Sequence, residues 1–191
     1  GSSAGRRPRR TPATRRRQAT IGILVGLLLS ALDGTVVATA LPQILEDLDG
    51  FSLYFLPNAA FMLLSTVSMP IWGRLSDHHG RGRLHFVAIA VLVGGSVLCG
   101  LSTTMTQLVS FRAVQGLGAG GVMALSFTMI ADLYDLESRA RMQGAISSVW
   151  GVAALIGPLL GAVMTKAFGW ASIFWLNVPV GILSVILLQT A

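Results

Sequence analysis

The chain has 191 residues, of which 53% are hydrophobic and 12% are charged. Soluble domains average about 25% charged residues, so this composition excludes an ordinary soluble protein and predicts a chain that lies mostly in lipid. The net charge of +6 does not indicate a nucleic-acid partner, because seven of the fourteen basic residues precede the first apolar stretch and no aromatic residue is interspersed among them.

The basic N-terminal segment, residues 1–19, combines Arg with Pro, Ser and Thr. We expect it to be a disordered cytoplasmic tail that contacts anionic lipid. The apolar stretch after it could instead be a cleaved signal peptide, because the Ala-Thr-Ala sequence at 38–40 resembles a cleavage site. Asp33 interrupts that stretch and further apolar stretches follow, so we expect the segment to stay in the mature protein.

Six apolar stretches are long enough to cross a bilayer. A hydrocarbon core of about 30 Å needs roughly 20 helical residues, and unpaired backbone amides are too costly in lipid, so each stretch is predicted to be a helix. The stretches are residues 20–41, 54–73, 84–102, 107–131, 143–165 and 172–190. The predicted fold is an all-α membrane domain over 20–191. The sequence begins without Met and ends inside an apolar stretch, so we expect it to be part of a longer polypeptide.

The basic residues outside the stretches predict the orientation. Seven lie in the tail and five arginines follow the second and fourth stretches, whereas Lys166 alone lies on the other side. Basic residues in short connections mark the cytoplasmic side of a membrane protein. We therefore expect a multi-pass protein of the cell (inner) membrane with its N-terminus in the cytoplasm.

Two charged residues lie inside predicted membrane helices. At a rise of 1.5 Å per residue, Asp33 lies roughly 13 Å and Arg112 roughly 8 Å below the outer surface. A charge near the centre of such a helix costs about 2.5–3.5 kcal/mol, so we expect the two to offset each other or to face an aqueous cavity. Gln115, three residues after Arg112, shares its helix face. The pair is either purely structural or part of a transport pathway.

Glycines at four-residue spacing mark two of the stretches. Gly116 and Gly120 lie in the fourth, and Gly157 and Gly161 lie on either side of Pro158 in the fifth. Small residues at this spacing let helix backbones approach closely, so we expect a tightly packed helical domain.

Five segments in chain order resemble motifs of the major facilitator superfamily. Two resemble general motifs of the superfamily, namely GRLSDHHGR at 73–81 and RAVQG at 112–116. A third, GPLLG at 157–161, resembles the fifth-helix motif associated with antiporters. The other two resemble the first- and sixth-helix signatures of the fourteen-span drug:proton antiporter branch, namely LDGTVVATALP at 32–42 and FWLNVPVG at 174–181. The chain therefore resembles the N-terminal six-helix domain of such an antiporter.

The resemblance implies two inverted three-helix repeats and a C-terminal domain that this chain lacks. It implies proton-coupled export of drugs or other small amphipathic molecules, with the proton as coupling ion and no other cofactor. Asp33 would take up the proton, with Arg112 and Gln115 as partners that adjust its proton affinity. The motif at 157–161 would bend the fifth helix or pack it tightly against the other half. Five apolar side chains could line the cavity or could equally face lipid or the core, namely Phe61, Met62, Met123, Phe127 and Trp150.

The resemblance also implies a gate at the inner side. Asp77 would hold this gate shut through Arg81 and Asp132, and Gly73 and Gly80 belong to the same motif. The alternative is that this connection serves only as a topology signal.

Two other functions stay open. The chain could belong to a proton-coupled metabolite or amino-acid transporter, or to a membrane scaffold or sensor that transports nothing. An enzyme is not expected, because the sequence shows no metal-ligand cluster, phosphate-binding loop or set of nucleophile, base and acid.

Overall fold

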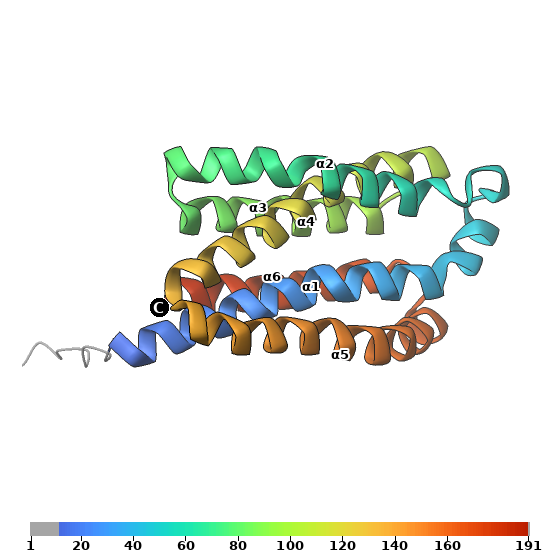
Figure 1. Cartoon of the computed structure of the whole chain (residues 1–191). Helices are drawn as coiled ribbons and strands as arrows, with labels where there is room; N and C mark the ends of the chain where they lie inside the picture. The colour runs from blue at the N-terminus through green and yellow to red at the C-terminus, as the bar shows by residue number, and fades with distance from the viewer. Residues whose placement is uncertain (1–11, 191) are drawn as a thin grey trace, which may run out of the picture.

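The computed structural model describes residues 12–190, and this range is helical apart from short connections (Figure 1). The elements are α1 (Pro12–Asp47), the short 3-10 helix η1 (Phe51–Leu53), α2 (Leu56–His79), α3 (Arg81–Gly100), α4 (Met105–Leu133), α5 (Leu136–Phe168) and α6 (Ser172–Gln189). Six of these helices are long and apolar enough to cross a membrane, which confirms the six predicted membrane helices. Within the described range the protein is an all-α multi-pass membrane domain.

The helices form two layers, with α2, α3 and α4 in one and α1, α5 and α6 in the other (Figure 1). In the first layer α2 and α3 pack against α4, in the second α5 and α6 pack against α1, and α3 packs against α6 between the layers. If α1, α2 and α3 are relabelled as α4, α5 and α6 and the reverse, the same set of helix pairs is in contact. The arrangement is therefore the expected pair of inverted three-helix repeats.

Glycines in α4 allow the neighbouring backbones to approach. A Cβ added to Gly116 would lie 2.5 Å from the carbonyl oxygen of Phe61 in α2, and one added to Gly120 would overlap the carbonyl of Ser65. Because backbone atoms cannot move aside as a flexible side chain can, both positions require glycine for this packing.

The glycines of α5 face α1, whereas the expected packing of this motif against another half of the protein stays a prediction. A Cβ on Gly157 would overlap Thr35, and one on Gly161 would lie 3.0 Å from the carbonyl oxygen of Val36. The hydroxyl of Thr35 also donates to the carbonyl oxygen of Ala153 at 3.2 Å. The two glycines thus allow α5 to pack closely on α1, and α5 continues through Pro158 without ending.

The N-terminal segment is more ordered than expected. The structure has residues 12–19 as the first turns of α1, whereas the sequence predicted disorder up to residue 19; residues 1–11 lie outside the described range. Arginine and glutamine are good helix formers. Contacts with Tyr134 at the α4–α5 connection also hold this start in place, because the Thr20 and Tyr134 hydroxyls are 2.7 Å apart and the Arg16 guanidinium lies 5.1 Å from the Tyr134 ring centroid.

The expected loop at 73–81 is almost entirely helical. The second helix runs to His79 and α3 begins at Arg81, so Gly80 alone connects them. Its φ of 86° lies in the left-handed region, which glycine adopts without a steric cost. Asp77 therefore lies in the last turn of α2 rather than in a loop.

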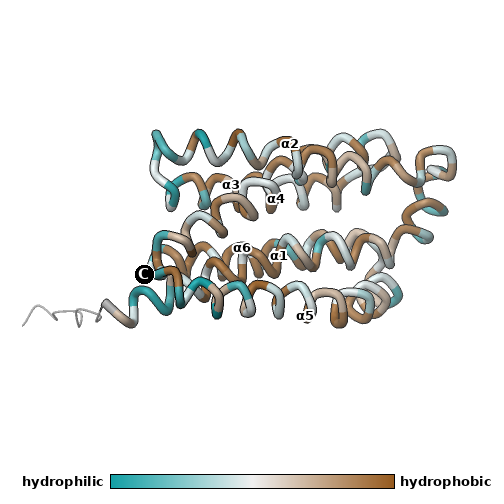
Figure 2. Tube along the Cα trace, viewed as in Figure 1, coloured by the Kyte–Doolittle hydropathy of each residue, from teal (hydrophilic) through white to brown (hydrophobic). Residues whose placement is uncertain are grey.

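Hydrophilic residues gather toward the ends of the helices, whereas the middle of the bundle is mostly hydrophobic (Figure 2). One end holds the first turns of α1, the α2–α3 connection and the α4–α5 connection, and we call it the arginine-rich end. Its described arginines are Arg15, Arg16, Arg17, Arg74, Arg81, Arg83, Arg139 and Arg141. Lys166 lies near the opposite end, close to the end of α5.

Candidate functional site

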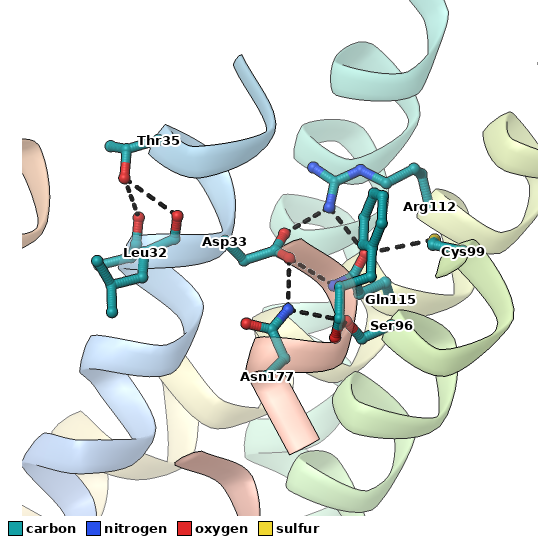
Figure 3. Close-up of polar contacts among 10 residues, drawn as sticks. Leu32, Asp33, Thr35, Ser96, Cys99, Arg112, Gln115 and Asn177 are labelled. Carbon is teal, nitrogen blue, oxygen red and sulfur yellow. Dashed lines mark hydrogen bonds and ion pairs between the residues drawn. The ribbon is translucent and has the colours of Figure 1, made fainter. Parts of the chain in front are cut away.

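A buried ion pair joins the first helix of each repeat. Arg112 of α4 donates through Nη1 to Oδ2 of Asp33 of α1, and each side chain is only 1% exposed (Figure 3). A buried charge is strongly unfavourable without a partner, so each of these residues makes the burial of the other possible. The structure thus brings together the two charges that the sequence placed in the membrane helices.

Two amide side chains complete the hydrogen bonds of the carboxylate. Gln115 donates through Nε2 to Oδ1 of Asp33 at 2.6 Å, and Asn177 of α6 donates to the same oxygen at 2.8 Å. Gln115 also accepts from Nη1 of Arg112 at 2.7 Å. Asp33 therefore accepts from three donors on two other helices, and we call these four residues the Asp33 cluster.

The guanidinium of Arg112 also contacts α2. Its Cζ atom lies 4.1 Å from the ring centroid of Phe61, within the range of a cation–π interaction. Among the residues that the structure describes, Nε of Arg112 has no hydrogen-bond partner. The arginine is thus held between a carboxylate of one layer and an aromatic ring of its own layer.

Sequence reasoning did not assign Asn177 and Ser96 to this site, although both contribute polar contacts. Asn177 lies inside an apolar helix and within the segment 174–181, which was noted as a motif but not assigned to the site. Its Nδ2 also donates to Ser96 of α3 at 2.8 Å, and the Ser96 hydroxyl donates to the carbonyl oxygen of Phe174. Asn177 could have been found because a polar side chain is unusual in the middle of a membrane helix. Ser96 gave no such signal, since a serine hydroxyl commonly donates to a backbone carbonyl of its own helix.

A cavity of about 360 Å³ adjoins the cluster and is bounded by α1, α2, α4 and α5. Arg112 is one of its lining residues, whereas its ion-pair partner Asp33 is not. The other lining residues are Ser30, Ala31, Gly34, Thr35, Asn58, Phe61, Met62, Ser65, Thr66, Met69, Ala119, Met123 and Trp150. Of the five apolar candidates for the cavity wall, Phe61, Met62, Met123 and Trp150 line it and Phe127 does not.

The residues of the expected gate meet at the arginine-rich end. Arg81 at the start of α3 forms an ion pair with Asp132 in the last turn of α4, and its guanidinium is 3.8 Å from the carboxylate of Asp77 in α2. Gly80 supplies the turn between the two helices, and a Cβ on Gly73 would meet nothing within 4 Å. The ion pairs therefore connect the ends of three helices of one layer, and neither glycine takes part in them.

Six apolar helices in two inverted repeats, with a buried ion pair beside a cavity, define the class of membrane transporter domains. The chain belongs to the major facilitator superfamily, whose family model matches residues 23–190. This family and the relatives below indicate a transporter rather than an enzyme.

Relatives with similar sequences carry names that refer to efflux. The chain is 43% identical over 164 residues to multidrug resistance protein 3 of Bacillus subtilis (strain 168), covering 86% of this chain and 32% of that protein. It is 38% identical over 165 residues to multidrug transporter protein MdtP of the same organism, covering 86% of this chain and 30% of that protein. The chain thus spans about a third of the length of these relatives.

Solved structures share the fold. The proton:xylose symporter XylE superposes with a TM-score of 0.83 at 17% sequence identity, covering 95% of this chain and 46% of that chain. The human organic anion transporter MFSD10 gives a TM-score of 0.79 at 20% identity, covering 94% of this chain and 48% of that one. At such low identity these likenesses support the fold alone.

Proposed function

We propose that this chain is the N-terminal half of a proton-coupled antiporter that exports drugs or other small amphipathic molecules. The observation that carries the proposal is the Asp33 cluster, a buried carboxylate and arginine at the edge of a cavity. The names of the relatives support efflux, and the small share of their length that the chain covers supports a second domain.

The coupling step is protonation of Asp33. A proton on the carboxyl group removes the charge that pairs with Arg112 and turns one acceptor oxygen into a donor. The carboxyl group then cannot accept from Arg112, Gln115 and Asn177 as the carboxylate does. Weakening of these bonds would loosen the contact of α1 with α4 and α6. Deprotonation favours substrate binding and protonation favours release.

Access to the carboxylate is controlled by the arginine. The Asp33 side chain is almost fully buried, whereas its partner Arg112 lines the cavity. Proton exchange therefore requires the guanidinium to move off the carboxylate. A substrate or a conformational change that displaces Arg112 would thereby control when the proton enters or leaves.

The cavity favours amphipathic substrates of varied shape. Its apolar walls include Met62, Met69, Met123, Phe61 and Trp150. Thioether side chains adapt to irregular shapes, and aromatic rings offer large contact surfaces. Among the described lining residues none is acidic, so apolar contact rather than ion pairing with a carboxylate would hold the substrate in this half.

The arginine-rich end is proposed to face the cytoplasm, with the chain in the inner membrane, because basic residues concentrate there. Arg81 and its partners Asp77 and Asp132 then lie at the inner mouth of the transporter, where they would help to keep the inner gate shut.

The test uses everted membrane vesicles that contain the whole transporter, an imposed pH gradient and a set of fluorescent amphipathic dyes. Asp33→Asn should abolish proton-driven dye transport while membrane insertion stays normal. Asp49→Asn is the matched control, because Asp49 is exposed and its φ of 48° suits asparagine. Unchanged transport by Asp33→Asn would refute the assignment, and transport that follows the opposite gradient would indicate symport.

A further inference from the structure

A groove lies on the face of the domain formed by α3 and α6, away from the cavity between α2 and α5. At the arginine-rich end it has a volume of about 610 Å³. Its lining residues there are Ala19, Gly82, Arg83, Phe86, Val87, Met129, Val185, Leu188 and Gln189. Apart from Arg83 and Gln189 this wall is apolar or, at Gly82, without a side chain, so it suits a molecule with a polar end and an apolar body.

The groove continues toward the middle of the bundle. A second hollow of about 210 Å³ shares Phe86 and Val185 with the first and runs between α3 and α6. Small residues shape it, because Ala90 leaves space on α3 and Gly181 allows α6 to lie against Val93. We call the two hollows together the α3–α6 groove.

The length of the groove matches one membrane leaflet. Arg83 at its polar end and Val93 at its apolar end are ten residues apart in α3. At 1.5 Å per residue the groove is about 15 Å long. Half of a hydrocarbon core of about 30 Å is the same length, which is the depth that the acyl chain of a phospholipid reaches in its own leaflet.

The mouth of the groove carries positive charge that no described acid neutralises. Arg83 is exposed and forms no ion pair with a described residue, and the same holds for Arg15 of α1. Arg15 lies four residues before Ala19 of the groove wall and thus on the same helix face. Two exposed guanidinium groups at the membrane surface favour a phosphate, which arginine binds well.

We propose that the α3–α6 groove binds an anionic phospholipid, with its phosphate at Arg83 and Arg15 and an acyl chain along Phe86, Val185 and Gly181. The lipid comes from the leaflet at the arginine-rich end. This site is separate from the substrate cavity, because the two share no lining residue. Its occupant would fasten α3 to α6, the two helices that meet between the layers.

The experiment measures lipid retention by the whole transporter. The purified protein is equilibrated in detergent with equal amounts of phosphatidylglycerol and phosphatidylethanolamine, and bound lipids are counted by native mass spectrometry. We expect the parent to retain phosphatidylglycerol preferentially. Arg83→Gln should weaken that retention about fivefold, the effect of one basic residue near an anionic surface. Arg141→Gln, an exposed arginine at the same end on α5, should leave it unchanged.

A second variant tests the apolar part of the groove. Ala90→Phe fills the space between α3 and α6 and should reduce phosphatidylglycerol retention although both arginines are present. Equal retention of the two lipids by the parent would overturn the proposal. So would parental retention by Arg83→Gln, or an equal loss in Arg83→Gln and Arg141→Gln, since the latter would indicate a diffuse effect of charge.

Discussion

Replacing Asp33 with Asn tests the cluster with almost no change in side-chain volume. In the parent, Oδ1 accepts from Gln115 and Asn177 while Oδ2 accepts from Arg112. An asparagine has one carbonyl oxygen and one amide nitrogen, so in either orientation its amide faces a donor. The guanidinium of Arg112 also loses its counter-charge while remaining buried.

The expected cost is large because one partner of a buried ion pair is removed while the other remains. Such changes destabilise proteins by about 3–5 kcal/mol. We expect a clear fall in the thermal unfolding midpoint of the purified transporter and loss of proton-driven export. The double variant Asp33→Asn with Arg112→Met removes both charges, so it should recover much of the stability of the parent but none of the export.

The comparison of single and double variants separates folding from coupling. If the double variant is no more stable than either single variant, the two side chains do not act as a coupled pair. If Asp33→Asn keeps both the parental unfolding midpoint and parental export, the reasoning from the buried carboxylate is refuted.

Other predictions concern helix packing, the gate and pH. Gly120→Ala should destabilise the domain by about 1–3 kcal/mol because its Cβ would overlap α2. The control Gly94→Ala, whose Cβ would face open space, should be neutral or stabilising by about 0.5–1 kcal/mol. Equal thermal unfolding midpoints of the two variants would contradict this difference. Reversing the charge of Arg81 or of Asp132 should change stability by less than about 1 kcal/mol, because the two side chains are 32% and 54% exposed. Either reversal should nevertheless lower export. Reversing both charges together should restore export in vesicles. Asp135 caps α5, and its hydrogen bonds with Ser138 lower its pKa. Its contribution to stability is therefore present above about pH 4 and is lost as the pH falls through the lowered pKa of the folded state. Asp135→Asn should keep the cap and remove that dependence, as measured by hydrogen exchange of the first turn of α5.

Hydropathy predicted the existence and order of the helices but not their ends. The first helix was expected at 20–41 and runs from Pro12 to Asp47, and the fifth was expected at 143–165 and runs from Leu136 to Phe168. The added turns carry polar and charged residues that lie beyond an apolar core, so a search for apolar stretches cannot find them. Local caps such as Asp135 at α5 set these ends instead.

The site could be predicted in part for a similar reason. Asp33 and Arg112 stood out because charges inside apolar stretches are costly and need a partner. The contribution of Asn177 and Ser96 depends on how α3 and α6 are rotated about their axes, which the sequence does not specify. The same applies to Gly157 and Gly161, whose spacing indicated close packing but not that α1 is the neighbour.

The placement of the ion pair between the two layers bears on how the domain deforms. Within each layer the helices are fitted to one another at glycines such as Gly120 and Gly157, where overlap with a neighbour prevents sliding. We therefore expect the helices of one layer to move together. Asp33 belongs to one layer and Arg112 to the other, so their ion pair connects the two layers. If Asp33 is protonated as proposed, loss of this ion pair would let the two layers of the domain move relative to each other, in addition to any movement against a second domain.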